Sequence, residues 1–341
     1  MAFRVVRDPH VAASVLAAGG LVGLPTETVY GLAADARNEA AIARVFAVKG
    51  RPVNHPLIVH LADPAAVADW AMAVSPAARV LMAAHWPGPL TIVLRKRHHV
   101  SDLITGGQPT VAVRVPDSPA ALRTIAELGR LTGTRGAVVA PSANRFGAVS
   151  PTSAAHVRVG LDDWVQPGDA VLDAGDARVG VESTIVDATG GRLRVLRPGA
   201  VQVPSTVNTE VAAVATMAGS APPRVPGSLA SHYSPAARVL ICDAADVHAR
   251  ATLPATFTQS GVPASASHGA TQIGLIAPAE VSTPVNWRRL AAPVDDVEYA
   301  RVLYAALRAA DDAELDVVVT VLPVAGLLLP AITDRLQRAA R

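Results

Sequence analysis

The chain is short of several residue types, and each shortage argues against a class of protein. Its 341 residues include one cysteine, Cys242, so no internal disulfide can form, and the apolar run around it predicts a buried small hydrophobe. Aromatic residues make up 4%, which is few for a protein that reads single strands by base stacking. Charged residues make up 17% and the net charge is +2, so the chain is not polybasic, although a small anion or RNA remains compatible with it.

Two apolar stretches imitate membrane signals, but a folded domain explains them better. Residues 11–24 follow two arginines, yet Asp8-Pro9 is typical of a helix start and Gly19-Gly20 of a helix end. Residues 317–332 contain two prolines and a glycine and fall short of the roughly 20 apolar residues that a span needs, so a strand, a turn and a helix start are expected. We therefore expect a soluble, cytoplasmic protein.

The usual nucleotide and hydrolase motifs are missing from the sequence. There is no Walker A box, no GxGxxG after a strand, no GxSxG and no HExxH. A nucleotide site would have to be assembled from scattered cations and main-chain amides.

Helix starts are marked by a capping residue followed by proline, because the cap accepts from an orphan N–H and proline has none to leave unpaired. Asn38 is expected to cap a further helix that ends near Lys49-Gly50. Between the helices lie short β-rich runs, and two of them flank a Thr-Gly-Gly turn typical of a hairpin. This pattern predicts an α/β domain with a mixed sheet. The capping pairs are Asp8-Pro9, Asp63-Pro64, Ser75-Pro76, Ser118-Pro119 and Ser150-Pro151, and the runs are 21–24, 56–61, 90–96, 110–116, 136–141, 183–188 and 192–198.

The composition changes near residue 218. Residues 219–237 are rich in Pro, Ser, Gly and Ala and are predicted to be a linker between a first domain, 1–218, and a second, 238–341. The second domain alternates strand and helix patterns, which predicts a small doubly wound, Rossmann-like fold of about 100 residues.

Lysine is rare in this chain. Of 30 Lys and Arg residues only Lys49 and Lys96 are lysine, which leaves 28 arginines. A turn at Gly50 could aim Lys49 and Arg51 at one point, where a compact ammonium and a planar guanidinium suit a polyphosphate. From spacing alone the better interpretation is that both cations complement the helix dipole. The rarity of lysine makes the phosphate-binding interpretation more competitive, because an arginine could have complemented the dipole equally well.

Other candidates are weak when taken singly. Ser142 and Asn144 follow a strand and could present polar groups to phosphate oxygens, although an ordinary turn explains them as well. His60 lies in an apolar run, where a satisfied core histidine is the usual outcome. Arg114 and Arg197 are single arginines in β-rich runs, and each is either a surface charge or an anion ligand.

Taken together and in order, these motifs resemble the threonylcarbamoyl-adenylate synthases of the YrdC-like family. The resemblance covers about residues 8–203, and 226–235 with the second domain resemble the long form of the family. It implies a twisted mixed sheet with helices and a concave active-site face, plus a smaller Rossmann-like C-terminal α/β domain. The motifs are PTETVYGL (25–32), Lys49-Gly50-Arg51-Pro52, PLIVH (56–60), TVAVRVP (110–116), PSAN (141–144), SPT (150–152), ESTIVD (182–187) and LRPG (196–199).

The resemblance also implies which residues form the site. Mg²⁺ is expected with ATP, but no ligand set is identifiable. His55 stands where family members often have asparagine, and its charge would depend on pH. The implied catalytic residues are Lys49, Arg51, Ser142 and Asn144; those for ATP are Arg51, His55, Thr110, Ala140 (main chain), Ser142, Ser150, Arg197 and Tyr233; those for L-threonine are Thr28, His60, Arg114 and Ser183.

The implied activity is a nucleotidyl transfer. L-Threonine, bicarbonate and ATP would give threonylcarbamoyl-AMP and pyrophosphate, and a tRNA-modifying transferase machinery would use the product to make threonylcarbamoyladenosine. Weak RNA binding is a further expectation. Two alternatives stay open: a module that binds double-stranded RNA without catalysis, and a related enzyme that uses carbamoyl phosphate. The linker is expected to fold over the active site, or else Tyr233 packs at the start of the second domain.

Overall fold

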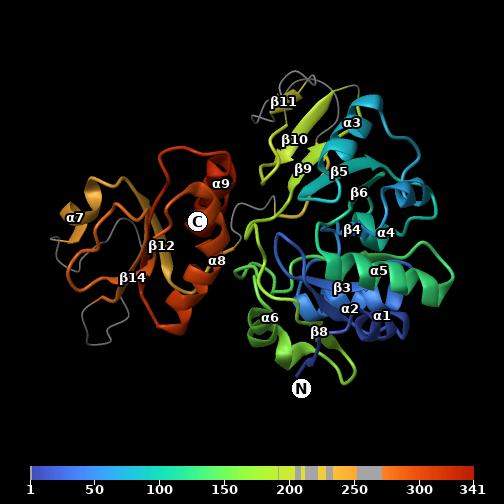
Figure 1. Cartoon of the computed structure of the whole chain (residues 1–341), viewed down its shortest axis with the longest axis horizontal. Helices are drawn as coiled ribbons and strands as arrows, with labels where there is room; N and C mark the ends of the chain where they lie inside the picture. Colours follow the sequence, from blue (N-terminus) through green and yellow to red (C-terminus); the bar gives the residue numbers. More distant parts are fainter. Residues whose placement is uncertain (1, 191, 204–208, 212–221, 228–232, 252–270) are drawn as a thin grey trace. The chain divides into compact units, whose positions relative to one another are not determined.

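A computed structural model describes residues 2–190, 192–203, 209–211, 222–227, 233–251 and 271–341. The chain divides into two compact units, Met1–Leu229 and Ala230–Arg341 (Figure 1). The boundary lies within the predicted linker, of which the structure describes residues 222–227 and 233–237.

In the described part of the first unit the strands form one mixed sheet of eleven strands, as the sequence predicts. β4 pairs in parallel with β6, and β5 pairs antiparallel to β6 and parallel to β9. β9 and β10 form the expected antiparallel hairpin. In spatial order the strands are β1 (Arg4–Val6), β8 (Ala170–Leu172), β2 (Val22–Leu24), β3 (Gly31–Asp35), β7 (Ala137–Val139), β4 (Ile58–Leu61), β6 (Thr110–Arg114), β5 (Leu90–Arg95), β9 (Thr184–Asp187), β10 (Leu193–Arg197) and β11 (Thr209–Val211).

The helices of the first unit begin mostly where the sequence predicts. Asp8, Asn38, Ser75 and Ser118 each cap a helix by accepting from a main-chain N–H. The helical segments are α1 (Pro9–Ala17), α2 (Glu39–Lys49), η1 (Pro64–Asp69), α3 (Pro76–His85), α4 (Asp102–Thr105), α5 (Pro119–Thr132), α6 (Ala154–Leu161) and η2 (Asp162–Trp164).

Two of the predicted helix starts need correction. The segment after Asp63 is a 3₁₀ helix rather than an α-helix. Ser150-Pro151 does not begin a helix, because α6 starts later with Ser153 as its cap. The hydroxyl of Ser150 donates instead to the buried carboxylate of Glu182, so this serine belongs to the site described below.

Apolar residues that alternate along the strands place a core on each side of the sheet. In β3, Leu32 and Ala34 face one core and Ala33 faces the other. The first core is completed by α2 and α3 and the second by α1 and α5, which lie side by side in Figure 1. Burial on both faces explains why the strand runs read as almost continuously apolar sequence.

The second unit holds a four-stranded parallel sheet among its described residues, in the order β12-β15-β13-β14. α8 and α9 lie on one side of it in Figure 1 and α7 on the other, so the predicted parallel α/β fold is confirmed. Cys242 is buried, as expected. The elements are β12 (Arg238–Cys242), α7 (Asp246–Ala251), β13 (Ile273–Ile276), β14 (Arg288–Ala291), α8 (Asp296–Asp312), β15 (Val317–Val321) and α9 (Leu329–Ala339).

The apolar run 317–332 is a strand, a connection and the start of a helix, as predicted. Across the part of the chain that the structure describes, every helix is too short or too polar to cross a bilayer.

Candidate active site

Strand pairing brings several of the predicted site residues to one edge of the first unit's sheet. His60 and Arg114 are direct partners on β4 and β6. Because β5 runs antiparallel to β6 and parallel to β9, Ser183, which precedes β9, lies at the same edge as the end of β6. Thr110 lies at the other end of β6, about 13 Å from Arg114 by the rise of a strand.

Lys49 joins the end of α2 to the turn after β7. Its side chain is buried, with 2% of the residue exposed, and its Nζ donates to the main-chain oxygens of Ser142 and Asn144, each at 2.5 Å. The N–H of Phe146 donates back to the Lys49 oxygen at 2.8 Å. Burial, followed by the charges of Arg51 and Arg145, lowers the pKa of Lys49 well below its ordinary value. Lys49 is therefore part of the packed interior at this end of α2.

Gly50 makes the sharp turn that the sequence predicts. It caps α2 in the left-handed conformation at φ 61°, which favours glycine. A Cβ at this position would lie 2.7 Å from Nη2 of Arg145, whose guanidinium donates to the Val48 oxygen near the end of α2. The two predicted motifs, KGR and SAN, are thus tied together through main-chain groups.

Asn144 shapes the turn after β7 with its amide. Its Nδ2 donates to the oxygens of Arg145 and Ala148, both at 2.7 Å, while its Oδ1 is buried with no hydrogen-bond partner among the described residues. The N–H of Ala140 donates to the Ile58 oxygen at 3.3 Å. The predicted main-chain contact of Ala140 with ATP would therefore use its carbonyl oxygen.

Arg51 and His55 meet around the ring of Phe146. Arg51 donates to the Pro56 oxygen at 2.9 Å, and its guanidinium lies 5.8 Å from the centre of the Phe146 ring. The His55 ring meets the same ring edge-on at 5.4 Å. Burial, followed by the charges of Arg51 and Arg224, lowers the pKa of His55, so its imidazole is neutral at neutral pH. His55 can therefore replace asparagine as an uncharged polar group.

The residues predicted to bind threonine lie around Arg114. Its Nη1 donates to the hydroxyl of Thr28 at 3.0 Å, and its Nε donates to the Gly88 oxygen at 3.3 Å. The Thr26 hydroxyl donates to the Val29 oxygen at 2.6 Å, so in the 2.9 Å contact between the two threonine hydroxyls Thr28 is the donor. With its proton used, Thr28 has only acceptor capacity left for a substrate.

His60 is a buried neutral acceptor beside Arg114. Its Nδ1 lies 3.1 Å from the Ile58 oxygen, and because a carbonyl can only accept, we assign the proton to Nδ1. Burial, followed by the charge of Arg114, lowers the pKa of His60 from 6.5 to about 3. Nε2 is therefore an acceptor across the physiological range of pH.

Ser183 and Arg197, predicted for different substrates, belong to one network. Arg197 donates through Nε to the main-chain oxygen of Ser183 and through Nη2 to its hydroxyl, both at 3.1 Å. Its Nη1 donates to the Pro226 oxygen at 3.0 Å. Thr91 shares a 2.8 Å hydrogen bond with the Ser183 hydroxyl. The neighbouring Glu182 accepts from Ser150 at 2.7 Å, which brings the predicted ATP and threonine residues together.

Tyr233 lies in the second unit and is packed there. Its ring stacks on Tyr304 at 5.6 Å with Arg335 over it at 5.4 Å, and 1% of the residue is exposed. In this structure Tyr233 therefore packs at the start of the second unit, which was one of its two expected positions. The contact of Tyr233 with ATP stays a prediction. Of the rest of the proposed lid, residues 222–227 and 234–237 are described, whereas 219–221 and 228–232 lie outside the described residues.

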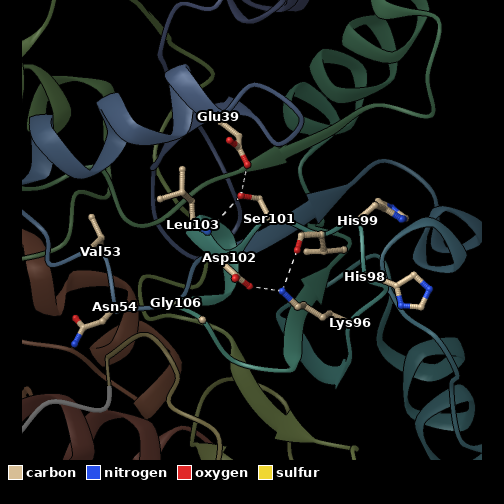
Figure 2. Close-up of a pocket in the computed structure, with 12 residues that line it drawn as sticks. Glu39, Val53, Asn54, Lys96, His98, His99, Ser101, Asp102, Leu103 and Gly106 are labelled. Carbon is tan, nitrogen blue, oxygen red and sulfur yellow. Dashed lines mark hydrogen bonds and ion pairs between the residues drawn. The ribbon is translucent and has the colours of Figure 1, made fainter.

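The second lysine of the chain serves a different part of the first unit. Figure 2 shows a pocket of about 680 Å³ in which Lys96 points at Asp102, at 2.5 Å, while Ser101 donates to Glu39. None of the predicted site residues lines this pocket. Within the described residues no group of three or more His, Cys, Asp or Glu side chains could hold a metal ion.

Three residues contact the site without having been predicted as part of it. Glu27 lies 2.6 Å from Arg114, and Glu182 accepts a hydrogen bond from Ser150. The ring of Phe146 contacts both Arg51 and His55. Glu27 and Glu182 each stand next to a predicted residue in the same motif, and Phe146 follows the PSAN motif by two positions. That proximity is the only signal the sequence offers. A carboxylate in a site for anionic substrates is not expected from charge alone.

Buried cations, hydroxyls and a neutral histidine at the strand ends of a mixed sheet define an α/β protein whose sheet edge can hold an anionic substrate. Comparison with known families agrees with this class. The family model described as "Telomere recombination", which groups Sua5, YciO and YrdC, matches residues 14–199, and the model "Threonylcarbamoyl-AMP synthase, C-terminal domain" matches residues 199–341. The chain belongs to the Sua5/YrdC family, in its form with the additional C-terminal domain.

Named relatives cover most of the chain. The threonylcarbamoyl-AMP synthases of Pyrococcus abyssi and Bacillus subtilis are 39% and 37% identical over 69% of this chain and 67% of their own length. The crystal structure of P. abyssi Sua5 complexed with L-threonine matches with a TM-score of 0.81 and 33% identity, over 100% of this chain and 98% of that one. A variant of that protein with an adjacent His and Tyr replaced by Ala also matches with a TM-score of 0.81, at 32% identity over 99% and 96% of the two chains.

Proposed function

We propose that this protein is an L-threonylcarbamoyladenylate synthase. The threonine amine and bicarbonate condense to a carbamate with loss of water, and a carbamate oxygen attacks the α-phosphorus of ATP. The bond from that phosphorus to the bridging oxygen breaks, and pyrophosphate leaves. The observation that carries the proposal is that Arg114 and the hydrogen-bonded pair of Ser183 and Arg197 lie at one sheet edge, in a chain whose relatives carry this name.

Such a transfer needs positioning and positive charge more than covalent help from the protein. Arg51 and Arg197 are held by main-chain oxygens, so their guanidinium groups are oriented before the triphosphate arrives. We assign to them the stabilisation of the phosphoryl oxygens and of pyrophosphate. Arg114 receives the threonine carboxylate, and Thr28 and His60 accept hydrogen bonds from its polar groups.

Mg²⁺ enters this proposal as part of the ATP substrate. The described residues offer no carboxylate cluster that fits a resident ion, and Glu27 and Glu182 are already engaged with Arg114 and Ser150. No step is assigned to a protein-bound metal.

The adenylate would pass to a transferase machinery that modifies tRNA, and we propose a cytoplasmic location for this exchange. A labile carbamoyl-adenylate is best made close to its consumer. Weak binding of RNA by the basic first unit is a separate proposal, and it predicts a salt-dependent affinity.

Release of pyrophosphate in the presence and absence of threonine tests the activity. We expect release that requires ATP, bicarbonate and threonine together. Release that requires carbamoyl phosphate instead would identify the related carbamoyl-adenylating reaction. Binding of double-stranded RNA with no pyrophosphate release under any of these conditions would identify a binding module.

A further inference from the structure

Glu27 is a buried carboxylate that no substrate contact explains. Only 3% of the residue is exposed, and its Oε1 lies 2.6 Å from Nη2 of Arg114, which is equally buried. The pair is not aligned as a directional hydrogen bond, and neither oxygen of Glu27 has another hydrogen-bond partner among the described residues. The contact is therefore one of charge pairing.

A buried pair of this kind is not favoured for stability alone. Removing two charges from water costs several kcal/mol per ion, and apolar side chains of similar volume often do as well. The pair also places a negative charge beside an arginine that is predicted to bind a carboxylate. Glu27 therefore needs a role that compensates for the positive charge that it neutralises on Arg114.

Glu27 completes a set of three anchors around one guanidinium group. Gly88 accepts from Nε, Thr28 accepts from Nη1, and Glu27 attracts Nη2. Contacts at all three nitrogens restrict the tilt of the group more than the two hydrogen bonds alone. Bidentate recognition of a carboxylate depends on that plane.

We propose that Glu27 is the positioning residue of the threonine site: it holds the plane of Arg114 and balances its charge, so that a zwitterionic amino acid is preferred to a more highly charged anion. The inference rests on the proposed role of Arg114. Glu27 acts through Arg114 and not on ATP.

The test measures Michaelis constants for threonine and for ATP in Glu27→Ala, Glu27→Gln, Arg114→Ala and the double variant. Partners that orient a binding group typically contribute 10–100-fold, so Glu27→Ala is expected to raise the KM for threonine about tenfold. The KM for ATP stays within about twofold, a change of under 0.5 kcal/mol. In the Arg114→Ala background the same change has no further effect, because the group it positions is gone.

Asp117→Ala is the matched control. Asp117 and Glu27 line the same pocket of about 450 Å³, and Asp117 pairs with Arg178 at 2.7 Å on a largely exposed surface. Its loss leaves both Michaelis constants unchanged.

The outcomes separate this inference from the function on which it rests. If Arg114→Ala leaves the threonine KM unchanged, the proposed role of Arg114 fails. If Arg114→Ala raises that constant but Glu27→Ala does not, or raises it equally for ATP, the positioning role is overturned. Additive effects in the double variant overturn it as well. Should Glu27→Ala fail to fold, the nearly isosteric Glu27→Gln tests the same positioning role. It is expected to raise the KM for threonine about threefold, or about 0.7 kcal/mol, and to leave the KM for ATP unchanged.

Discussion

Replacing Lys49 by methionine tests whether this lysine holds the active-site turn together. Methionine keeps most of the buried aliphatic volume but removes the ammonium that donates to the oxygens of Ser142 and Asn144. The Ser142 oxygen also accepts from the N–H of Asn144 at 3.0 Å, so only the Asn144 oxygen loses its donor, and a buried carbonyl without a donor costs about 1–3 kcal/mol. Relief of the buried charge offsets part of this cost, and we expect a net loss of about 1–2 kcal/mol in the free energy of unfolding.

Urea unfolding and pyrophosphate release, measured on the same samples, provide the assay. Lys96→Met is the matched control, because Lys96 donates to the Val100 oxygen and pairs with the exposed Asp102 away from the predicted site residues, so its loss should leave turnover unchanged. Lys49→Met should lose both stability and turnover, since the turn that carries Ser142 is released. Full stability with lost turnover would refute the structural role and favour a direct phosphate contact. Full stability with full turnover would refute both.

Three further predictions concern the rest of the chain. The pKa of His60 falls on folding from 6.5 to about 3, so the free energy of unfolding is highest above pH 6.5 and decreases as the pH falls below that value. The decrease reaches about 1.4 kcal/mol by about pH 5.5, and His60→Gln should remove it from the pH profile measured by urea unfolding. Gly50→Ala should cost at least about 1 kcal/mol, because φ is 61° and its Cβ would meet Arg145, and an unchanged unfolding midpoint would contradict this. Tyr233→Ala should destabilise the second unit by about 3 kcal/mol in calorimetry, whereas a rise in the KM for ATP with no loss of stability would indicate the nucleotide contact instead.

The fold was predictable where local chemistry decides it. Capping side chains before proline located α1, η1, α3 and α5, and continuous apolar runs located the central strands. Ser150-Pro151 was wrongly predicted to begin a helix, because the Ser150 hydroxyl donates to a buried carboxylate 32 residues away. No local pattern in the sequence reveals such a partner. Short strands such as β8 and β14 were missed because three or four residues carry too little periodicity to stand out.

The members of the site were predictable, but the part each one plays in the fold was not. Lys49 was expected to face a phosphate, a contact that stays a prediction, and the structure shows that its ammonium also donates to two main-chain oxygens. That difference depends on which loop faces the helix end, and the loop lies more than 90 residues further along the chain. Glu27 went unassigned for a similar reason, since its partner Arg114 comes from a distant strand.

How the cations are held also bears on which substrate each one meets. Lys49, Arg51 and Arg197 each donate to main-chain carbonyls, which orient a cation without cancelling a full charge. Arg114 is paired with a carboxylate, so its half of the site is close to neutral. A triphosphate gains most where positive charge is left uncancelled, while a zwitterionic amino acid gains from matched charges of both signs. Charge alone can therefore favour ATP beside Arg51 and Arg197 and threonine beside Arg114 at the same sheet edge. Because the Glu27–Arg114 pair is buried and is screened little by salt, exchanging Glu27 for a neutral residue should weaken that preference by a similar factor at low and at high salt.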